Sequence, residues 1–384
     1  MTTFRLRDRT IDAASPVFVI AELSGNHNGS KARALELVHA AAEAGADAVK
    51  LQTYTADTIT MDAPGPWFRI QGGPWDGRGL YELYQEASTP WDWHADLFAE
   101  ARKRGLVCFS TPFDPTAVDY LEALDAPLHK VASFEVVDIP LLQKVGATKK
   151  PVIMSTGMAS LAEIDTAVKT LRAHGCPSLA LLHCVSAYPA KAADMHLATI
   201  PHLAQAFGCV AGLSDHSLTA TAAVAATALG GRVLEKHLCM RRSEGGPDSG
   251  FSLEPQELAA TIAAVREAHA ATIQGVAYGP GTTDAANVQF RKSLFAACDI
   301  PAGTVLTPAH IRDIRPGHGL PPADLPRVLG RTARVFIARG TPLAWDQFSS
   351  GTRPSRSLAM RPGRSRSRLH RPGVGSSLDG AATN

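Results

Sequence analysis

Two histidines stand at corresponding points of two consecutive apolar runs and could hold one metal ion. His216 ends the run AGLSDH, and His237 lies in the run RVLEKHL. If these runs are neighbouring strands, two imidazoles face one ion and leave most coordination positions open for water and substrate oxygens. Such a site suits a Lewis-acid Mn²⁺ or Mg²⁺ ion better than a closed structural zinc site. Two hydrogen-bonded core histidines are the alternative interpretation.

Three lysines also lie within apolar runs, where an ammonium group is costly unless an anion accompanies it. Together with nearby hydroxyl groups they could form a socket for a phosphate and a carboxylate on one small ligand. A Schiff-base aldolase is the rival use of such a lysine, but a metal ion would make an imine unnecessary. The residues of this predicted socket are Lys50, Lys130 and Lys236, with the hydroxyl groups of Thr111, Ser133, Ser155, Ser186 and Ser214.

Two carboxylates complete the set of candidate reactive groups. Glu22 ends an apolar run directly before SGNHNG, and a carboxylate facing a cationic socket would stay ionised and could handle protons or orient water. A plain salt bridge to a nearby lysine is the alternative. Asp248, in the loop SEGGPDSGFSL, is a hydrogen-bond acceptor suited to sugar hydroxyls.

Eight short apolar or β-branched runs carry these residues, and amphipathic helical patterns separate several of them. Two of the helical patterns end at Gly45 and Gly175, as helix C-termini often do. Strands alternating with helices in this way predict an α/β fold, a (β/α)8 TIM barrel, whose active sites lie at the carboxyl ends of the strands. A doubly wound open sheet is the competing architecture, but no GxGxxG motif follows the first run. The runs are residues 17–23, 48–53, 107–112, 129–133, 151–156, 179–184, 211–216 and 232–238.

Residues 54–95 interrupt this alternation with a long insertion that contains four of the five tryptophans. Long loops at the carboxyl end of a barrel often cover the site. We expect Trp75 and Asp76 to face the site. We expect Trp91 and Trp93 to pack in a small satellite core.

The changes in composition predict four segments. They are a barrel domain at residues 1–280, a linker at 281–290, a small α+β domain at 291–350 and a disordered tail at 351–384. The tail holds seven arginines and one aspartate, so the rest of the chain is net negative although the whole carries +2. An Arg-rich tail could bind a polyanion by charge alone, but such runs are usually solvated, and we expect no nucleic-acid partner.

The overall composition excludes several other classes of protein. The chain has 384 residues, of which 45% are hydrophobic and 19% charged, which is ordinary soluble usage and sufficient for a large core. No run reaches the roughly 18 apolar residues of a membrane span, and the first residues lack the apolar core of a signal peptide. The six cysteines form no CxxC motif. We therefore expect a cytoplasmic protein with reduced thiols and no membrane partner.

Nine motifs, taken in order, resemble the sialic acid synthase family, and most closely its pseudaminic acid branch. The resemblance extends from about residue 16 to residue 349, and IRPGHGL is similar to the signature of the antifreeze-like (SAF) domain that ends these proteins. The motifs are AELSGNHNGS, ADAVKLQTYTADTITMD, FSTPFD, HKVASFEVVDIPL, STGMASLAEI, CVSAYPA, GLSDHS, EKHL and GGPDSGFSLEP.

The resemblance implies an enzyme that condenses phosphoenolpyruvate with an open-chain amino-sugar aldehyde, giving a nine-carbon 2-keto acid and phosphate with C–O cleavage. The pseudaminic branch implies 2,4-diacetamido-2,4,6-trideoxyaltrose as the sugar, with N-acetylmannosamine and the legionaminic acid precursor as alternatives. The resemblance further implies a domain-swapped homodimer in which one subunit's SAF domain caps its partner's barrel. A non-catalytic sugar-binding protein is the alternative of a different class.

The resemblance also implies roles for individual residues. A divalent ion, Mn²⁺ or else Mg²⁺ or Co²⁺, would bind His216 and His237, and Glu22 would be the catalytic glutamate. Sugar contacts fall on Glu135, Tyr188 and Asp248, with Arg315 supplied across the dimer to the N-acyl group. Ser186 stands where sialic acid synthases carry Asn, a departure that the pseudaminic branch shares. The phosphoenolpyruvate contacts fall on Lys50, Thr111, Lys130, Ser133, Ser155 and Ser214.

Overall fold

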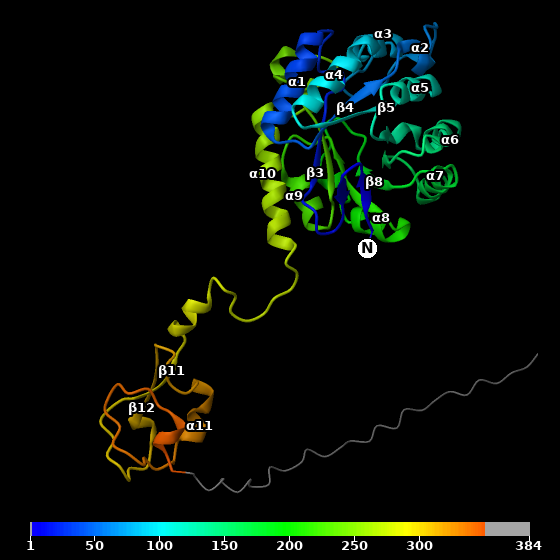
Figure 1. Cartoon of the computed structure of the whole chain (residues 1–384). Coiled ribbons are helices and arrows are strands. Elements are labelled where there is room, and N and C mark those ends of the chain that lie inside the picture. The colour runs from blue at the N-terminus through cyan, green and yellow to red at the C-terminus, as the bar shows by residue number, and fades with distance from the viewer. Residues whose placement is uncertain (1, 350–384) are drawn as a thin grey trace, which may run out of the picture. The chain divides into compact units, whose positions relative to one another are not determined.

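Eight parallel strands form a closed barrel in the computed structural model, which describes residues 2–349 (Figure 1). Neighbours follow the order β10-β3-β4-β5-β6-β7-β8-β9, and β10 closes the barrel against β3. The predicted (β/α)8 barrel is therefore confirmed, and each of the eight predicted runs forms one barrel strand. The strands are β3 (Phe18–Glu22), β4 (Ala48–Thr53), β5 (Val107–Pro112), β6 (His129–Val131), β7 (Val152–Ser155), β8 (Leu179–Cys184), β9 (Val210–Asp215) and β10 (Val233–His237).

Helices surround the strands, each burying an apolar face against the outside of the barrel (Figure 1). α1 begins after Ser30, whose side chain accepts a hydrogen bond from the Arg33 amide, and ends at Gly45 with φ 87°. The left-handed conformation at Gly45 is the reason a glycine stands there. The helices that follow strands are α1 (Lys31–Ala44), α4 (Trp91–Lys103), α5 (Pro115–Ala123), α6 (Ile139–Ala147), α7 (Leu161–Ala173), α8 (Thr199–Phe207), α9 (Thr221–Ala228) and α10 (Pro255–Thr272).

The inside of the barrel changes from apolar to polar along the strands. Successive side chains of a strand point to opposite faces, so residues two apart share a face. Phe18 and Ile20 lie in the apolar inner core, and Glu22 follows them on the same face of β3. In β10, Val233 belongs to that inner core, whereas Leu234 packs in the outer core beneath the helices. The polar carboxyl ends of the strands thus rest on an apolar floor.

A short hairpin precedes the barrel and was not predicted. β1 (Phe4–Leu6) pairs antiparallel with β2 (Arg9–Ile11). Phe4, Leu6 and Ile11 are buried in the same core as the inner barrel residues. Strands of three residues are too short to show a hydrophobic period, which is why the sequence pattern gave no signal for them.

The insertion at residues 54–95 folds into two further helices, α2 (Ala56–Ile59) and α3 (Leu80–Ala87), before α4 begins. Trp91 packs on Tyr120 with ring centroids 4.7 Å apart, and its Nε1 donates a hydrogen bond to the Tyr54 carbonyl oxygen. Trp93 packs against the outer barrel core. Both tryptophans therefore have a packing role, as expected, but the predicted satellite core is wrong for Trp93, because it packs against the main outer core of the barrel.

The chain divides after Val276, and a second compact unit begins at Ala277. Within it, β11 (Ser293–Ala296) pairs antiparallel with β12 (Ile311–Ile314), and the short helix α11 (Leu325–Val328) completes a small core. The predicted disordered tail, residues 351–384, lies outside the described residues. No helix between residues 2 and 349 is long and apolar enough to cross a membrane.

Candidate active site

A cavity of about 550 Å³ opens where the barrel strands reach their carboxyl ends, within the size range of small-molecule sites. Residues from strand ends, from the loops after them and from the insertion line it. The structure brings together in this lining ten of the residues that the sequence predicts to act in the site: Lys50, Lys130, Ser133, Glu135, Ser155, Tyr188, Ser214, His216, His237 and Asp248.

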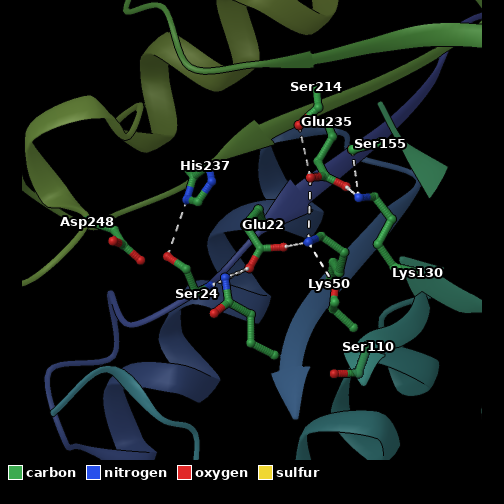
Figure 2. A network of polar contacts seen from close by, with 12 residues as sticks. Glu22, Ser24, Lys50, Ser110, Lys130, Ser155, Ser214, Glu235, His237 and Asp248 are labelled. Atoms are coloured by element: carbon green, nitrogen blue, oxygen red, sulfur yellow. Dashed lines mark hydrogen bonds and ion pairs between the residues drawn. The ribbon is translucent and has the colours of Figure 1, made fainter. Parts of the chain in front are cut away.

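Four buried charged side chains form a connected network at the floor of the cavity (Figure 2). The Lys50 ammonium lies 2.5 Å from Glu22 Oε2 and 3.5 Å from Glu235 Oε1. The Lys130 ammonium lies 3.9 Å from Glu235 Oε2 and donates a hydrogen bond to Ser155 Oγ at 2.7 Å. Each of these four side chains is at most 5% exposed. Two ammonium groups and two carboxylates balance, so burial is compensated before any ligand binds.

Burial and charge act against each other on these four groups. Burial raises the pKa of Glu22, and the opposing pull of Lys50 only reduces that shift. Burial also opposes ionisation of Glu235, but Lys130 and Lys50 outweigh it and lower its pKa. Lys50 has its pKa raised because its two carboxylate partners overcome the effect of burial. Glu22 is therefore the carboxylate of the network that binds a proton more readily than a free glutamate.

Glu22 sits beneath Lys50 and is not among the residues that line the cavity. Its Oε1 accepts hydrogen bonds from the Ser24 amide at 2.9 Å and from Gln52 Nε2 at 3.1 Å. Its other oxygen faces the Lys50 ammonium (Figure 2). Thr111 is likewise outside the cavity lining. Its hydroxyl group is buried in the barrel and accepts a hydrogen bond from the Lys50 ammonium at 3.2 Å.

Glu235 is a central member of the network that the sequence analysis missed. It lies two residues before His237 on β10, so the two side chains share the inner face of the strand. Counting back by two from the histidine would have found it. The same alternation corrects Lys236, which was predicted to belong to the socket. Lys236 points outward, pairs with Asp215 Oδ2 at 3.0 Å and donates a hydrogen bond to the Ser217 carbonyl oxygen.

His216 and His237 lie side by side in the cavity, with ring centroids 5.2 Å apart. His216 Nδ1 lies 3.0 Å from the Val185 carbonyl oxygen, which can only accept, so Nε2 carries the lone pair whenever the ring is neutral. Burial lowers the pKa of His216, but the neighbouring Cys184 outweighs burial and raises it. His237 Nδ1 contacts Ser24 Oγ at 3.3 Å, which also leaves Nε2 free. The pKa of His237 is well below its ordinary value. Burial is the larger cause and repulsion by His216 is the next, so the His237 ring is neutral near pH 7.

This pair fits a divalent ion with open coordination positions. Neutral imidazoles whose second nitrogen is held by a hydrogen bond are the usual state of metal-binding histidines. No group of three or more His, Cys, Asp or Glu side chains within residues 2–349 is arranged to hold a metal ion. Any ion at this pair would therefore depend on water and substrate oxygens for its remaining ligands.

The hydroxyl groups of the predicted socket divide into two sets. Ser133 Oγ accepts a hydrogen bond from the Gly157 amide at 3.1 Å, and Ser214 Oγ donates to Glu235 at 3.2 Å, both within the cavity lining. Ser186 is not in the lining but lies beside Gly157, where an added Cβ would come within 2.6 Å of Ser186 Oγ. Glycine at position 157 is what allows this loop to approach both serines.

Aromatic side chains surround the two histidines. Tyr188 lies 4.4 Å from His216, and Phe251 lies 5.0 Å from His237, between ring centroids. Trp75 contacts Tyr188 at 5.4 Å, and its Nε1 donates a hydrogen bond to the Pro247 carbonyl oxygen at 2.7 Å. Trp75 faces the cavity as predicted. Asp76 does not: its carboxylate is exposed and accepts a hydrogen bond from the Gly72 amide at 2.6 Å, which closes a local turn.

Two of the predicted sugar-contact residues, Asp248 and Arg315, lie in different units of the chain. Asp248 is partly buried in the cavity lining, and this burial raises its pKa, while its Oδ2 accepts a hydrogen bond from the Gly25 amide at 3.3 Å. Arg315 is an exposed residue of the second unit, directly after β12. Each unit is described by itself, so the contact of Arg315 with a sugar stays a prediction.

Glu135 gives a testable pH dependence. Burial, only partly opposed by Lys130, raises the pKa of this carboxyl to about 7. Between its ordinary pKa and pH 7 the folded protein holds a proton that the unfolded chain releases, so stability falls as the pH rises through this window. We expect Glu135→Gln to raise the melting temperature at pH 8, and by more than at pH 5.5. Thermal unfolding at the two pH values checks this, and an equal shift at both would contradict it.

A closed eight-stranded parallel barrel with a polar cavity at the carboxyl ends of its strands defines a (β/α)8-barrel enzyme. The NeuB family model matches residues 37–277, and the SAF domain model matches residues 291–349. The chain belongs to the NeuB family, so the resemblance to sialic acid synthases is confirmed.

Curated relatives and solved structures agree with this assignment. The chain is 41% identical over 334 residues to the pseudaminic acid synthase of Helicobacter pylori, covering 87% of this chain and 98% of that one. It is 32% identical over 338 residues to the N,N'-diacetyllegionaminic acid synthase of Legionella pneumophila, covering 87% and 95% of the two chains. The crystal structure of the N-acetylneuraminic acid synthetase from Leptospira borgpetersenii matches 75% of this chain and 96% of its own, with 29% identity and a TM-score of 0.67.

Proposed function

We propose that this chain condenses phosphoenolpyruvate with 2,4-diacetamido-2,4,6-trideoxyaltrose to pseudaminic acid and phosphate. The observation that carries the proposal is the similarity to the Helicobacter pylori pseudaminic acid synthase, which covers 98% of that protein. The identity to that synthase is 41%, compared with 32% to the legionaminic acid synthase. The lysine and hydroxyl groups in the cavity support the phosphoenolpyruvate half of the reaction. N-acetylmannosamine and the legionaminic acid precursor remain the competing sugars.

Phosphoenolpyruvate would bind over Lys50 and Lys130, whose ammonium groups lie at the cavity floor. Hydroxyl groups of Ser133, Ser155 and Ser214 line the same region and can donate hydrogen bonds to the phosphate and carboxylate oxygens. An anionic ligand competes with Glu22 and Glu235 for the lysines. We therefore expect substrate binding to lengthen the contact between Lys50 and Glu22 and to free the Glu22 carboxylate.

His216 and His237 are the residues that would hold the divalent ion, which we propose to be Mn²⁺, with Mg²⁺ or Co²⁺ as alternatives. When bound, such an ion polarises the sugar aldehyde and makes its carbon electrophilic. Tyr188, Phe251 and Asp248 line the cavity around the histidines and would position the sugar there.

The reaction begins when C3 of phosphoenolpyruvate attacks the aldehyde carbon with the electron pair of its double bond. The aldehyde oxygen takes up a proton and becomes a hydroxyl group. Water adds to C2 and gives its proton to Glu22, whose raised pKa suits it to accept one. The bond between C2 and the phosphate oxygen then breaks with its electron pair going to the phosphate, and the remaining C2 hydroxyl proton passes to the departing phosphate, which leaves the 2-keto acid. Lys50 and Lys130 stabilise the charge that develops on the departing phosphate.

The test is phosphate release from phosphoenolpyruvate, measured with the three sugars in parallel. We expect turnover with the altrose-type diacetamido sugar and much slower release with the other two. If another sugar is turned over best, the specificity proposal is wrong although the chemistry stands. Borohydride trapping of a lysine adduct would instead indicate an aldolase, and absence of release with every sugar would indicate a sugar-binding protein.

We extend the proposal to assembly and location. A homodimer in which one subunit's SAF domain caps the partner's barrel would bring Arg315 to the N-acyl group of the sugar. The exposure of Arg315 after β12 supports such a role. A cytoplasmic location follows from the need for phosphoenolpyruvate. Light scattering of the full chain tests the dimer.

A further inference from the structure

The insertion contributes one whole side of the cavity, and that side carries no charged or amide groups. Each insertion residue that lines the cavity is apolar or aromatic, and the polar side-chain groups are two tyrosine hydroxyl groups and the Trp75 Nε1–H, which is already bonded to the Pro247 carbonyl oxygen. In contrast, the strand ends supply lysines, histidines, carboxylates and serines to the same cavity. We call the aliphatic part of this side the apolar wall, and it consists of Ile59, Ile70, Leu80 and Leu83.

The apolar wall belongs to ordered elements and not to a loose loop. Ile59 ends α2, while Leu80 and Leu83 lie in α3. Tyr81 on α3 donates a hydrogen bond to Asp57 on α2 at 3.1 Å, which ties the two helices together. Ile70 is fixed by backbone hydrogen bonds in both directions, to the Arg78 carbonyl oxygen and from the Gly77 amide, each at 2.9 Å.

Three wall residues are only partly buried although they are aliphatic. Ile59, Ile70 and Leu80 are half-buried, and they line the cavity together with the buried Leu83. Apolar surface left against water in a cavity is unfavourable until an apolar group covers it. The wall is therefore suited to the part of a ligand that has methyl groups. Its four aliphatic side chains cannot form a hydrogen bond with a ligand hydroxyl group.

We propose that the apolar wall binds the 6-deoxy end of the sugar and selects against sugars with a 6-hydroxyl group. This inference rests on the proposed function. With the aldehyde carbon at the two histidines and phosphoenolpyruvate at the two lysines, both polar regions of the cavity are occupied. The far end of the open-chain sugar then meets the insertion side. A 6-hydroxyl group packed on the four aliphatic side chains of the wall loses its hydrogen bonds to water, and those side chains offer no replacement.

The experiment compares two sugars that differ by one oxygen atom, 2,4-diacetamido-2,4,6-trideoxyaltrose and its 6-hydroxy counterpart. We expect the unaltered protein to favour the deoxy sugar by about 10- to 100-fold in kcat/KM, the range one such group gives in an apolar pocket. Ile59→Thr, Ile70→Thr and Leu80→Thr are made singly and together. The combined variant is expected to reduce this preference about tenfold or more, mainly through KM, with the KM for phosphoenolpyruvate unchanged.

Met61→Thr is the matched control, because Met61 belongs to the same insertion but is 60% exposed and outside the cavity lining. It should leave the preference unchanged. If the deoxy sugar is turned over but no wall variant changes the preference, the wall inference is wrong and the proposed function stands. If the unaltered protein releases no phosphate with the deoxy sugar, the proposed function fails and the inference with it. The single variants keep the test decisive if the combined one does not fold.

Discussion

His237→Ala is expected to lower phosphate release by at least about 10³-fold, and a chelator should do the same to the unaltered protein until Mn²⁺ is restored. The reason is geometric. No group of three or more His, Cys, Asp or Glu side chains within residues 2–349 is arranged to hold an ion, so an ion bound by His216 and His237 would keep a single histidine ligand in this variant. The neutral state of His237, imposed by burial, keeps its Nε2 lone pair available.

Direct measurement of Mn²⁺ binding, by titration calorimetry, separates loss of the ion from loss of the fold. His237→Ala should bind Mn²⁺ far more weakly while its melting temperature in chelator stays close to that of the unaltered chain. His39→Ala is the control, because His39 lies on α1 beside Glu100 and away from the cavity. Full activity in chelator, or unchanged Mn²⁺ binding by His237→Ala, would contradict the metal proposal.

Much of the barrel was predictable because its signals are local. Each strand is a short apolar run, and α1 shows both end signals, with Ser30 at its start and Gly45 at its end. The candidate site follows from the rule that barrel sites lie at strand carboxyl ends, which placed Lys50, Lys130, His216 and His237 in one cavity.

The misses have two physical causes. Glu235 was overlooked and Lys236 misplaced because the face of each residue along β10 was not followed, although the strand alternation determines it. The apolar wall could not be predicted, because its four residues come from α2, α3 and the segment 60–79 between them, which have no shared period. Only tertiary folding brings them to the cavity.

The charge network explains why two buried lysines are tolerated without a ligand. Glu22 and Glu235 both contact Lys50, and Glu235 also approaches Lys130. Removing either carboxylate leaves an ammonium group less compensated in the barrel. The two glutamates nevertheless differ, because Glu235 lines the cavity and has a lowered pKa, whereas Glu22 lies beneath Lys50 and has a raised one. This difference predicts different kinetic consequences for the same chemical change.

Glu22→Gln is expected to lower kcat by about 10² to 10⁴-fold with little change in the KM for phosphoenolpyruvate, because it removes a proton acceptor and keeps the shape of the side chain. Glu235→Gln is the matched comparison. It alters the contacts of Lys50, and also those of Lys130, without removing that acceptor, so its main effect should fall on the KM for phosphoenolpyruvate. Steady-state rates of phosphate release measure both. Equal losses of kcat in the two variants would mean that Glu22 acts only by holding Lys50, and the proton role proposed for it would be wrong.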